Sequence, residues 1–583
     1  MQTITIRTFI IIPLFTLLCA CENQPAPEIV FYNGTVITMA ENSDAASTRP
    51  DALLIREGVI VQVGGKRQVL AAAGPDAQQV DLAGATVLPG FIAAHTHPEL
   101  SAYLHTLVDL SGFKHDSPEA VWAELQQAVA KTEPGDWIFC KGFDPILVHG
   151  LETPHITQLD EIAPHNPVVI LSQSMHSAWA NSAAFEAVGI DADTPGPAPG
   201  SHYEVDDNGK LTGFIVEVAA MQPFMQKALD TFDIKDNFKQ VLRGYTQNGI
   251  TSIGTAGVFG NDDKPLMLMR WFSAEDPGLL LRMLAMFGAL PERETTVRNF
   301  VYLKAESPFE IPDKPERDDP GFQLIGIKIW YDGSPYTGSM YLSEPYLQSN
   351  LMQNGLGLPA DNRGGAVLSR DVFREQLKTF HDRGWQLAIH TQGDQATREV
   401  LADMIPVLEQ NPRSDHRHRL EHCLLVPPDI MQTIQVNGLT LSFHINHLYY
   451  YGPALENDII GPDRAGRMLP LASAVEQHVR FTLHADQPMY PEEPLSLMAT
   501  AVQRKTREGR TIGSDQSISA FQALRAVTIE AAWQLGMEDK IGSIEAGKLA
   551  DLVILNQNPL DVEPNDLRTI RVLSTYIGGR KVE

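Results

Sequence analysis

The 583-residue sequence has few cysteines and an excess of acidic over basic residues. Of its four cysteines, only Cys140 and Cys423 lie beyond the first 21 residues, and they form neither a disulfide framework nor a Cys-x-x-Cys metal site. A single bridge between them stays open, although two buried thiols are the simpler interpretation. Lysine and arginine number 45 against 72 acidic residues, and the net charge of −27 argues against nucleic acid or an anionic membrane surface as a partner.

The chain also lacks a membrane span, since its apolar run at residues 9–18 is too short to cross a bilayer stably. This run follows Arg7 and fits the core of a signal peptide over residues 1–21. The segment Leu18-Cys-Ala-Cys21 resembles a bacterial lipobox, in which Cys21 is acylated after cleavage; an ordinary secretory peptide is the alternative. We therefore expect a periplasmic protein that contacts the membrane only through a lipid anchor on Cys21, and Glu22 favours the outer membrane.

Two regions rich in short strands and turns, residues 28–88 and 540–583, enclose a long middle region. They predict one composite β-sandwich domain that is built from both chain ends. Residues 89–539 alternate apolar strands with helices such as 370–383 and 395–409. The candidate strands within the middle lie at residues 250–255, 279–287, 323–330, 386–390, 418–422, 440–444 and 480–486. The alternation predicts an α/β fold with a TIM-like (β/α)8 barrel, and the proline-rich stretch at about 112–235 predicts an insertion after its first strand.

His95 and His97 end an apolar run, and side chains two residues apart on a strand point to the same face. Two such imidazoles can bind a metal ion that activates water, although the pair alone is equally compatible with a polar surface. Further polar residues follow at predicted strand ends, namely Lys328, His390, His422 and Asp486. Because barrel enzymes place their chemistry at the carboxyl ends of the strands, this recurrence predicts a metal-dependent hydrolytic site.

These blocks, with Asp332-Gly-Ser, Gly393-Asp394, Asp486-x-Pro488 and the closing Gly542-to-Asp551 segment, resemble the amidohydrolase superfamily and its YtcJ-like branch. The resemblance implies two Zn²⁺ ions, although other divalent metals stay open. It implies that His95 and His97 bind one ion, that His390 and His422 bind the other, and that Asp486 is catalytic. Asp486 would take a proton from the attacking water and later protonate the leaving nitrogen.

Two further residues have open roles at the implied metal site. Lys328 would be a carboxylated lysine that bridges both metals, or else a buried lysine paired with Asp332 or Glu217. Glu217 would supply a bridging carboxylate to the metals, or else a charge on the surface of the insertion. Both alternatives remain at this point.

His176, His447 and His484 are candidates for substrate contacts, and so is His444. The chain departs from the branch at two places near them. The catalytic aspartate, commonly preceded by Gly-Ser, here follows His484-Ala485, and a segment that often carries Gln-Pro reads Phe443-His-Ile-Asn-His447. Since both departures lie where substrate would bind, the sequence does not name the substrate.

The sequence therefore predicts a hydrolase of a non-peptide carbon–nitrogen bond in a small-molecule amide, N-acyl or N-formyl compound. The alternative is a deaminase or a cyclic amide or amidine hydrolase on the same scaffold. Deaminases typically carry a glutamate three residues after the fifth-strand histidine, where this chain has Gly393. A dipeptidase and a binding protein that has lost catalysis also remain, although the intact set of site residues argues against the latter.

Overall fold

The computed structural model describes residues 26–40, 49–197, 201–231, 234–260, 262–308 and 310–582. The expected signal peptide and Cys21 lie outside these ranges, so the lipid anchor stays a prediction. Within them, no helix combines the length and apolarity needed to cross a membrane. Cys140 and Cys423 are both buried and neither is in a disulfide, which confirms the interpretation as two separate thiols.

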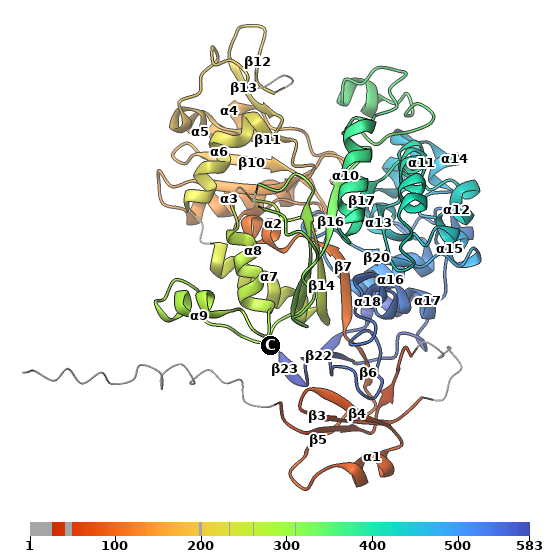
Figure 1. Cartoon of the computed structure of the whole chain (residues 1–583). Helices are drawn as coiled ribbons and strands as arrows, with labels where there is room; N and C mark the ends of the chain where they lie inside the picture. The colour runs from red at the N-terminus through yellow and green to blue at the C-terminus, as the bar shows by residue number, and fades with distance from the viewer. Residues whose placement is uncertain are drawn as a thin grey trace, which may run out of the picture.

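Eight parallel strands form a nearly closed barrel at the centre of the molecule (Figure 1). In spatial order they are β7 (Phe91–Thr96), β14 (Ile250–Ala256), β15 (Arg298–Lys304), β16 (Phe322–Trp330), β17 (Gln386–Thr391), β18 (Arg419–His422), β19 (Thr440–His444) and β20 (Phe481–His484). At the closing edge the backbone N–H of His97 donates to the Gln487 carbonyl, at 2.8 Å. The predicted α/β barrel is therefore confirmed.

Helices cover the outside of the barrel. They include α7 (Ile234–Gln247), α8 (Lys264–Ser273), α10 (Arg370–Asp382), α11 (Asp394–Gln410), α12 (Met431–Val436), α13 (Asn446–Ala454), α15 (Leu471–Glu476), α16 (Pro494–Gln503), α17 (Ala520–Ala526) and α18 (Ile529–Leu535). The predicted helices at 370–383 and 395–409 correspond to α10 and α11. Helix α10 begins after Ser369, whose hydroxyl caps the Val372 amide, and buries Phe373 and Leu377 against the barrel.

One predicted strand is wrong. Residues 279–287 form the helix α9 (Leu279–Met286), and the barrel strand at this point in the chain is β15 instead. In α9, Leu281 is buried while Leu280 and Met283 face solvent. A short apolar run does not distinguish a strand from a helix, and this run has the helical period.

Strands from both chain ends come together in the five-stranded sheet of β2 (Thr35–Val36), β6 (Thr86–Pro89), β21 (Leu552–Leu555), β22 (Val572–Ile577) and β23 (Arg580–Val582). A second sheet contains β4 (Val59–Gly64), β3 (Ala52–Arg56), β1 (Ile29–Tyr32) and β5 (Gln78–Asp81). The two sheets share an apolar core that includes Phe31, Leu53 and Leu552. Both chain ends thus contribute to one packed unit, while its exact boundaries stay a prediction.

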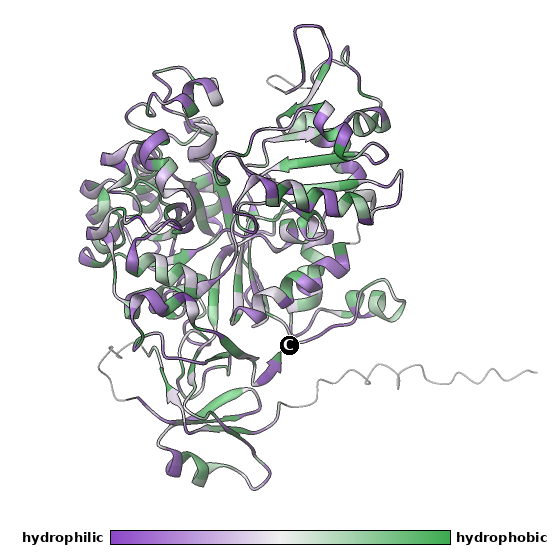
Figure 2. Cartoon of the chain, turned by 180° about the vertical axis from the view of Figure 1, so that it is seen from behind, coloured by the Kyte–Doolittle hydropathy of each residue, from purple (hydrophilic) through white to green (hydrophobic). Residues whose placement is uncertain are grey.

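A six-stranded sheet follows the first barrel strand. Its order is β12 (His202–Val205), β13 (Leu211–Val216), β11 (Ser177–Ala180), β10 (Val168–Ser172), β9 (Ile138–Phe143) and β8 (Val108–Asp109). Helices α3 (Pro118–Lys131), α4 (Ile156–Ile162), α5 (Ser182–Val188) and α6 (Val218–Thr231) accompany it. The sheet lies at the end of the barrel opposite the composite β unit, and seen from behind its strands are hydrophobic beside helices of mixed character (Figure 2).

Candidate metal centre

His95, His97 and Asp486 converge at the carboxyl ends of the first and last barrel strands. Asp486 Oδ1 lies 3.2 Å from His95 Nε2 and 3.1 Å from His97 Nε2. Among the described residues, His95 Nε2 and Asp486 Oδ1 are buried atoms without a hydrogen-bond partner. Two imidazole nitrogens and a carboxylate oxygen around one point form a donor set for a divalent metal, so these residues fit the implied ion.

A buried ion pair orients His95 from behind. Glu421 Oε2 accepts from His95 Nδ1 at 2.5 Å, and Arg419 on the same strand pairs with Glu421. Burial raises the pKa of the Glu421 carboxyl. The neighbouring Arg419 and His95 lower it by a larger amount, so the net pKa lies well below its ordinary 4.5. The anionic Glu421 therefore holds the proton of His95 on Nδ1 and leaves Nε2 free for a metal.

Asp486 is anionic at neutral pH for a similar reason. Burial raises the pKa of its carboxyl, but the neighbouring His95 and His97 lower it more, and the net pKa is well below 3.8. Its backbone has φ +61°, and that of His422 has φ +71°, both in the left-handed region that non-glycine residues rarely adopt. Strain of about 1–3 kcal/mol per residue is common where a site fixes the direction of a side chain.

His390 and His422 lie side by side on neighbouring strands, with their ring centroids 4.3 Å apart. His390 Nδ1 donates to Asp332 Oδ1 at 3.0 Å, and the Gln392 backbone N–H holds the same oxygen at 2.9 Å. His422 Nε2 is buried without a hydrogen-bond partner in the described part of the chain. The two imidazoles therefore lie close together, and their binding of one ion stays a prediction.

Lys328 is buried on β16, 1% exposed, with its Nζ 5.3 Å from the Trp330 ring. Its Nζ forms no hydrogen bond within the described ranges, so it pairs with neither Asp332 nor Glu217 there. Burial lowers the pKa of Lys328 to about 8, which leaves a neutral amine fraction at neutral pH. An unpaired buried amine of this kind fits carboxylation better than a structural ion pair.

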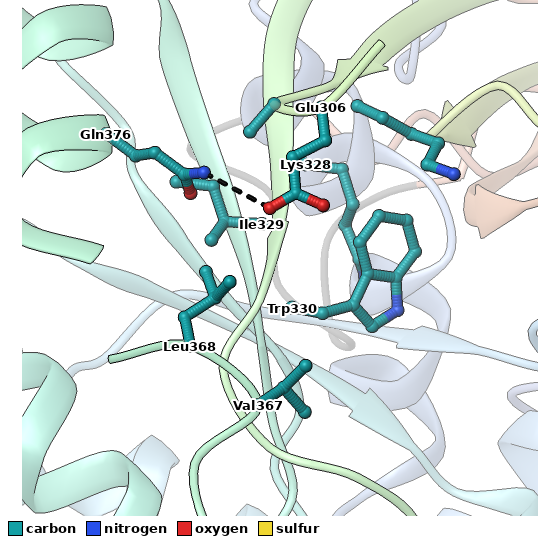
Figure 3. A pocket seen from close by; sticks show the side chains of 9 residues that line it. Glu306, Lys328, Ile329, Trp330, Val367, Leu368 and Gln376 are labelled. Atoms are coloured by element: carbon teal, nitrogen blue, oxygen red, sulfur yellow. Dashed lines mark hydrogen bonds between the residues drawn. The ribbon is translucent and has the colours of Figure 1, made fainter. Parts of the chain in front are cut away.

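A small cavity lies beside Lys328. Figure 3 shows Lys328 and Trp330 on one side of it and Gln376 on the other, with the Glu306 carboxylate between Lys328 and Gln376. Gln376 Nε2 donates to Glu306 Oε1 at 3.5 Å. Its volume of about 50 Å³ is room for a few water molecules and not for a substrate. A larger hollow of about 480 Å³ lies beside α16, and its lining residues include no histidine or cysteine.

The predicted substrate-contact histidines have different surroundings. Both nitrogens of His447 contact protein groups, since Nδ1 lies 2.6 Å from Tyr336 Oη and Nε2 lies 3.1 Å from Gln392 Nε2. His484 is fully buried and stacks on His95 at 4.5 Å. It thus lies among the implied metal ligands.

His176 and Glu217 lie together on the insertion sheet, away from these clusters of ligand atoms. Their side chains are 3.1 Å apart and are 51% and 48% exposed. The antiparallel pairing of β11 with β13 places them side by side. Neither residue belongs to the groups of histidine and carboxylate atoms that converge within 4.8 Å in the described residues.

The barrel and the converging donor atoms at its strand ends define a metal-dependent hydrolase. The chain matches the amidohydrolase family over residues 78–582 and belongs to that family. It is accordingly a hydrolase that acts on carbon–nitrogen bonds.

Characterised and putative relatives cover nearly the whole chain. It is 28% identical over 563 residues to an N-substituted formamide deformylase of Arthrobacter pascens. The matched region covers 95% of this chain and 97% of the relative. It is 24% identical over 570 residues to the putative amidohydrolase YtcJ of Bacillus subtilis, covering 95% and 99%. An uncharacterised metal-dependent hydrolase of Pyrococcus horikoshii has the same fold, with a TM-score of 0.67, 22% identity and coverage of 92% and 99%.

Proposed function

We propose that this protein removes an N-formyl or N-acyl group from a small-molecule amide. The observation that carries the proposal is the convergence of His95 Nε2, His97 Nε2 and Asp486 Oδ1 in a buried cluster, where His95 Nε2 and Asp486 Oδ1 have no hydrogen-bond partner in the described structure. The similarity to a formamide deformylase over most of both chains supports the N-formyl class.

His95 and His97 would hold one metal and His390 and His422 a second, with zinc favoured by the imidazole and carboxylate donors. A bound divalent metal supplies Lewis acidity and makes water a nucleophile at neutral pH. Asp486 accepts the proton of the attacking water at a carboxylate oxygen and later delivers it to the leaving nitrogen.

Lys328 is the candidate for carboxylation, because its Nζ is buried and unpaired within the described ranges. Its carbamate would supply an anionic ligand to the two metals. Glu217 is the weaker candidate for that role, since it is half exposed and bonded to His176.

The direct experiment is a substrate panel on zinc-loaded protein. N-formyl amines, N-acyl amino acids, cyclic ureides, dipeptides and aminopurine nucleosides would be compared by release of amine, carboxylate or ammonia. We expect turnover of N-formyl or N-acyl compounds. If the protein hydrolyses only cyclic amides or peptides, or only deaminates nucleosides, that activity replaces the proposed one. If it binds well under one metal per chain even with added zinc, the proposal is wrong.

Asp486→Asn tests the proton-transfer step. We expect kcat to fall by about 10²–10⁴-fold while bound metal is retained, because a neutral amide cannot accept the proton of water. Metal content by mass spectrometry and steady-state rates give the readout. Asp429→Asn, which alters an exposed pair with Arg398, is the matched control and should leave both unchanged. Full activity in the Asp486 variant would remove its assigned role.

A further inference from the structure

The hollow of about 480 Å³ beside α16 has the size of a ligand pocket, which is typically about 300–1,000 Å³. Segments that are distant in the sequence surround it, namely the end of α7, α13, the start of α16, and the stretch from the short 3-10 helix η7 (Pro564–Thr569) to β22. The hollow therefore lies between helices of the barrel and the composite β unit. Such junctions are frequent places for small-molecule sites.

Positive charge and apolar surface meet in this hollow. Two arginines, Arg568 and Arg571, line it together with one glutamate, Glu493, so its lining has a net charge of +1 in a chain whose net charge is −27. Its aromatic and aliphatic lining residues are Tyr449, Tyr450, Pro494, Leu495, Ile570 and Val572. A ligand that matches both features carries a negative charge on an apolar body.

Arg568 is held in place by uncharged groups. Its Nη1 donates to the Ser496 carbonyl at 3.1 Å and to Ser496 Oγ, and its Nη2 donates to Thr500 Oγ1 at 2.7 Å. The guanidinium also lies over the Tyr449 ring, with Cζ 3.9 Å from the ring centroid. Burial lowers the pKa of Arg568, and Glu493, which forms no ion pair with it in the described structure, compensates only in part.

The edge of Arg568 formed by Nε and Nη2 holds no anion among the described residues. Nη2 has two protons and gives one to Thr500, while Nε forms no hydrogen bond within the described ranges. An arginine favours a carboxylate at such an edge, because two parallel N–H···O bonds form at once. Elsewhere in this chain the same edge binds a carboxylate in the pairs Arg243–Glu294, Arg298–Asp551 and Arg370–Asp403.

We propose that the hollow beside α16 is a binding site for a small organic carboxylate with an aromatic or aliphatic body. The carboxylate would pair with the Nε–Nη2 edge of Arg568, and the body would lie against the rings and aliphatic side chains of the wall. Arg571, which is exposed, adds positive charge that attracts the anion. The site goes beyond the proposed hydrolytic reaction, since none of its lining residues belongs to the converging groups of metal-ligand atoms.

Aromatic rings connect the hollow with the surroundings of His447. The Tyr450 ring lies 5.6 Å from that of Tyr490, whose Oη lies 3.1 Å from His447 Nδ1. On another wall, Asn248 Nδ2 donates to the Glu492 carbonyl at 2.9 Å, just before α16. A ligand in the hollow would therefore contact α13, the helix that also carries His447.

Calorimetric titration of the zinc-loaded full chain with 3-phenylpropionate and with hexanoate tests the site. The comparison ligands are 3-phenylpropanamide, which has the body without the charge, and acetate, which has the charge without the body. We expect one carboxylate probe to bind per chain and both comparison ligands to bind at least about 10-fold more weakly, because the ion pair and the apolar contacts both contribute. Absence of saturable binding of both probes at millimolar concentration would overturn the proposal.

Variants locate the bound carboxylate. Arg568→Gln should weaken binding by about 10–100-fold, because it removes the charged hydrogen-bond donors. Leu495→Trp keeps both arginines and should weaken binding to a similar degree, because the larger side chain fills the hollow. Arg398→Gln, which alters the exposed pair with Asp429, is the matched control and should bind like wild type.

Circular dichroism checks the fold of each variant, and Leu495→Trp decides alone if Arg568→Gln does not fold. Unchanged binding in either folded variant would overturn the site. Loss of binding when zinc is removed would place the carboxylate at the metal centre and would also overturn it.

Discussion

Two buried glutamates near Asp486 show how neighbours decide the charge of a side chain. Glu421 is paired with Arg419 and is anionic, as described above. Glu492 has no hydrogen-bond partner for either carboxylate oxygen in the described structure, and burial together with the charge of Asp486 raises its pKa to about 8. Glu421 is thus an anion that orients the metal-ligand candidate His95, whereas Glu492 is a neutral acid.

Glu421→Gln should weaken metal binding and destabilise the fold. The amide cannot balance the buried charge of Arg419, which we expect to cost about 3–5 kcal/mol of unfolding free energy. The loss of the anionic partner of His95 should lower zinc affinity by about 10–100-fold. Denaturant unfolding and chelator competition measure the two effects. Wild-type values for both would show that the pair has no orienting role.

Glu492→Gln should stabilise the metal-free protein in a pH-dependent way. The carboxyl holds its proton in the folded state and releases it near 4.5 when unfolded, so its folded state loses stability as pH rises from about 4.5 to about 8. The glutamine variant escapes this loss. Its melting temperature should match wild type at pH 4.5 and exceed it increasingly toward pH 8, and equal differences at both pH values would contradict the assignment.

At the scale of elements, one buried ion pair ties the barrel to the composite β unit. Arg298, the first residue of β15, donates Nε to Asp551 Oδ2 at 2.6 Å and Nη2 to Oδ1 at 3.1 Å, just before β21. The Gly578 backbone N–H also donates to Asp551 at 2.7 Å. Three segments from different parts of the chain therefore share one carboxylate.

Asp551→Asn should be strongly destabilising. It leaves the buried Arg298 guanidinium with only the exposed Glu275, 3.6 Å away, as a counter-charge, and breaking a buried pair costs about 3–5 kcal/mol. Thermal and denaturant unfolding give the measurement. Asp561→Asn, in an exposed pair with Arg49, is the control and should change stability by less than about 1 kcal/mol. A similar small change in Asp551→Asn would show that the junction tolerates the loss of the Asp551 charge.

The sequence predicts helices and strands correctly where their hydrophobic pattern is long or recurs along the chain. Helices α10 and α11 have full amphipathic periods, and His95, His97 and Asp486 end strands whose carboxyl ends share one edge of the barrel. β15 is missed because its short apolar run is enclosed by Arg298 and Lys304, and the partner of Arg298, Asp551, lies far along the chain. The opposite charges of Arg419 and Glu421 two residues apart on one buried strand were a signal of the pair behind His95.

Other relations depend on register and tertiary contact. The pairing of His176 with Glu217 follows from the alignment of β11 with β13, which no local pattern specifies. The bond from His484 to His422 likewise joins two strands that are not adjacent in the sheet. Such contacts are set by the closed barrel and become visible only when it is assembled.

At the scale of the whole molecule, metal removal should lower stability. Ions that bind only the folded state stabilise it by mass action, by about 2.7 kcal/mol at a free concentration of 100 times Kd. Stripping the protein with a chelator should lower its melting temperature, and added zinc should restore it in a concentration-dependent manner. An identical melting curve before and after removal would mean that the buried donors gain nothing from an ion.

The sheet shared by both chain ends constrains how the protein can be made. About 460 residues separate β6 from its neighbour β21. The sequence separation between β7 and β20, where the barrel closes, is nearly as large. At about 5–20 residues per second, a ribosome needs roughly 20 to 90 s to supply β21. For that interval the edge of β6 is unpaired on the nascent chain, and the helices that cover the later strands have not yet emerged. During this stage the chain depends on protection from other chains, and β6 reaches its native pairing only when nearly the last residues are in place.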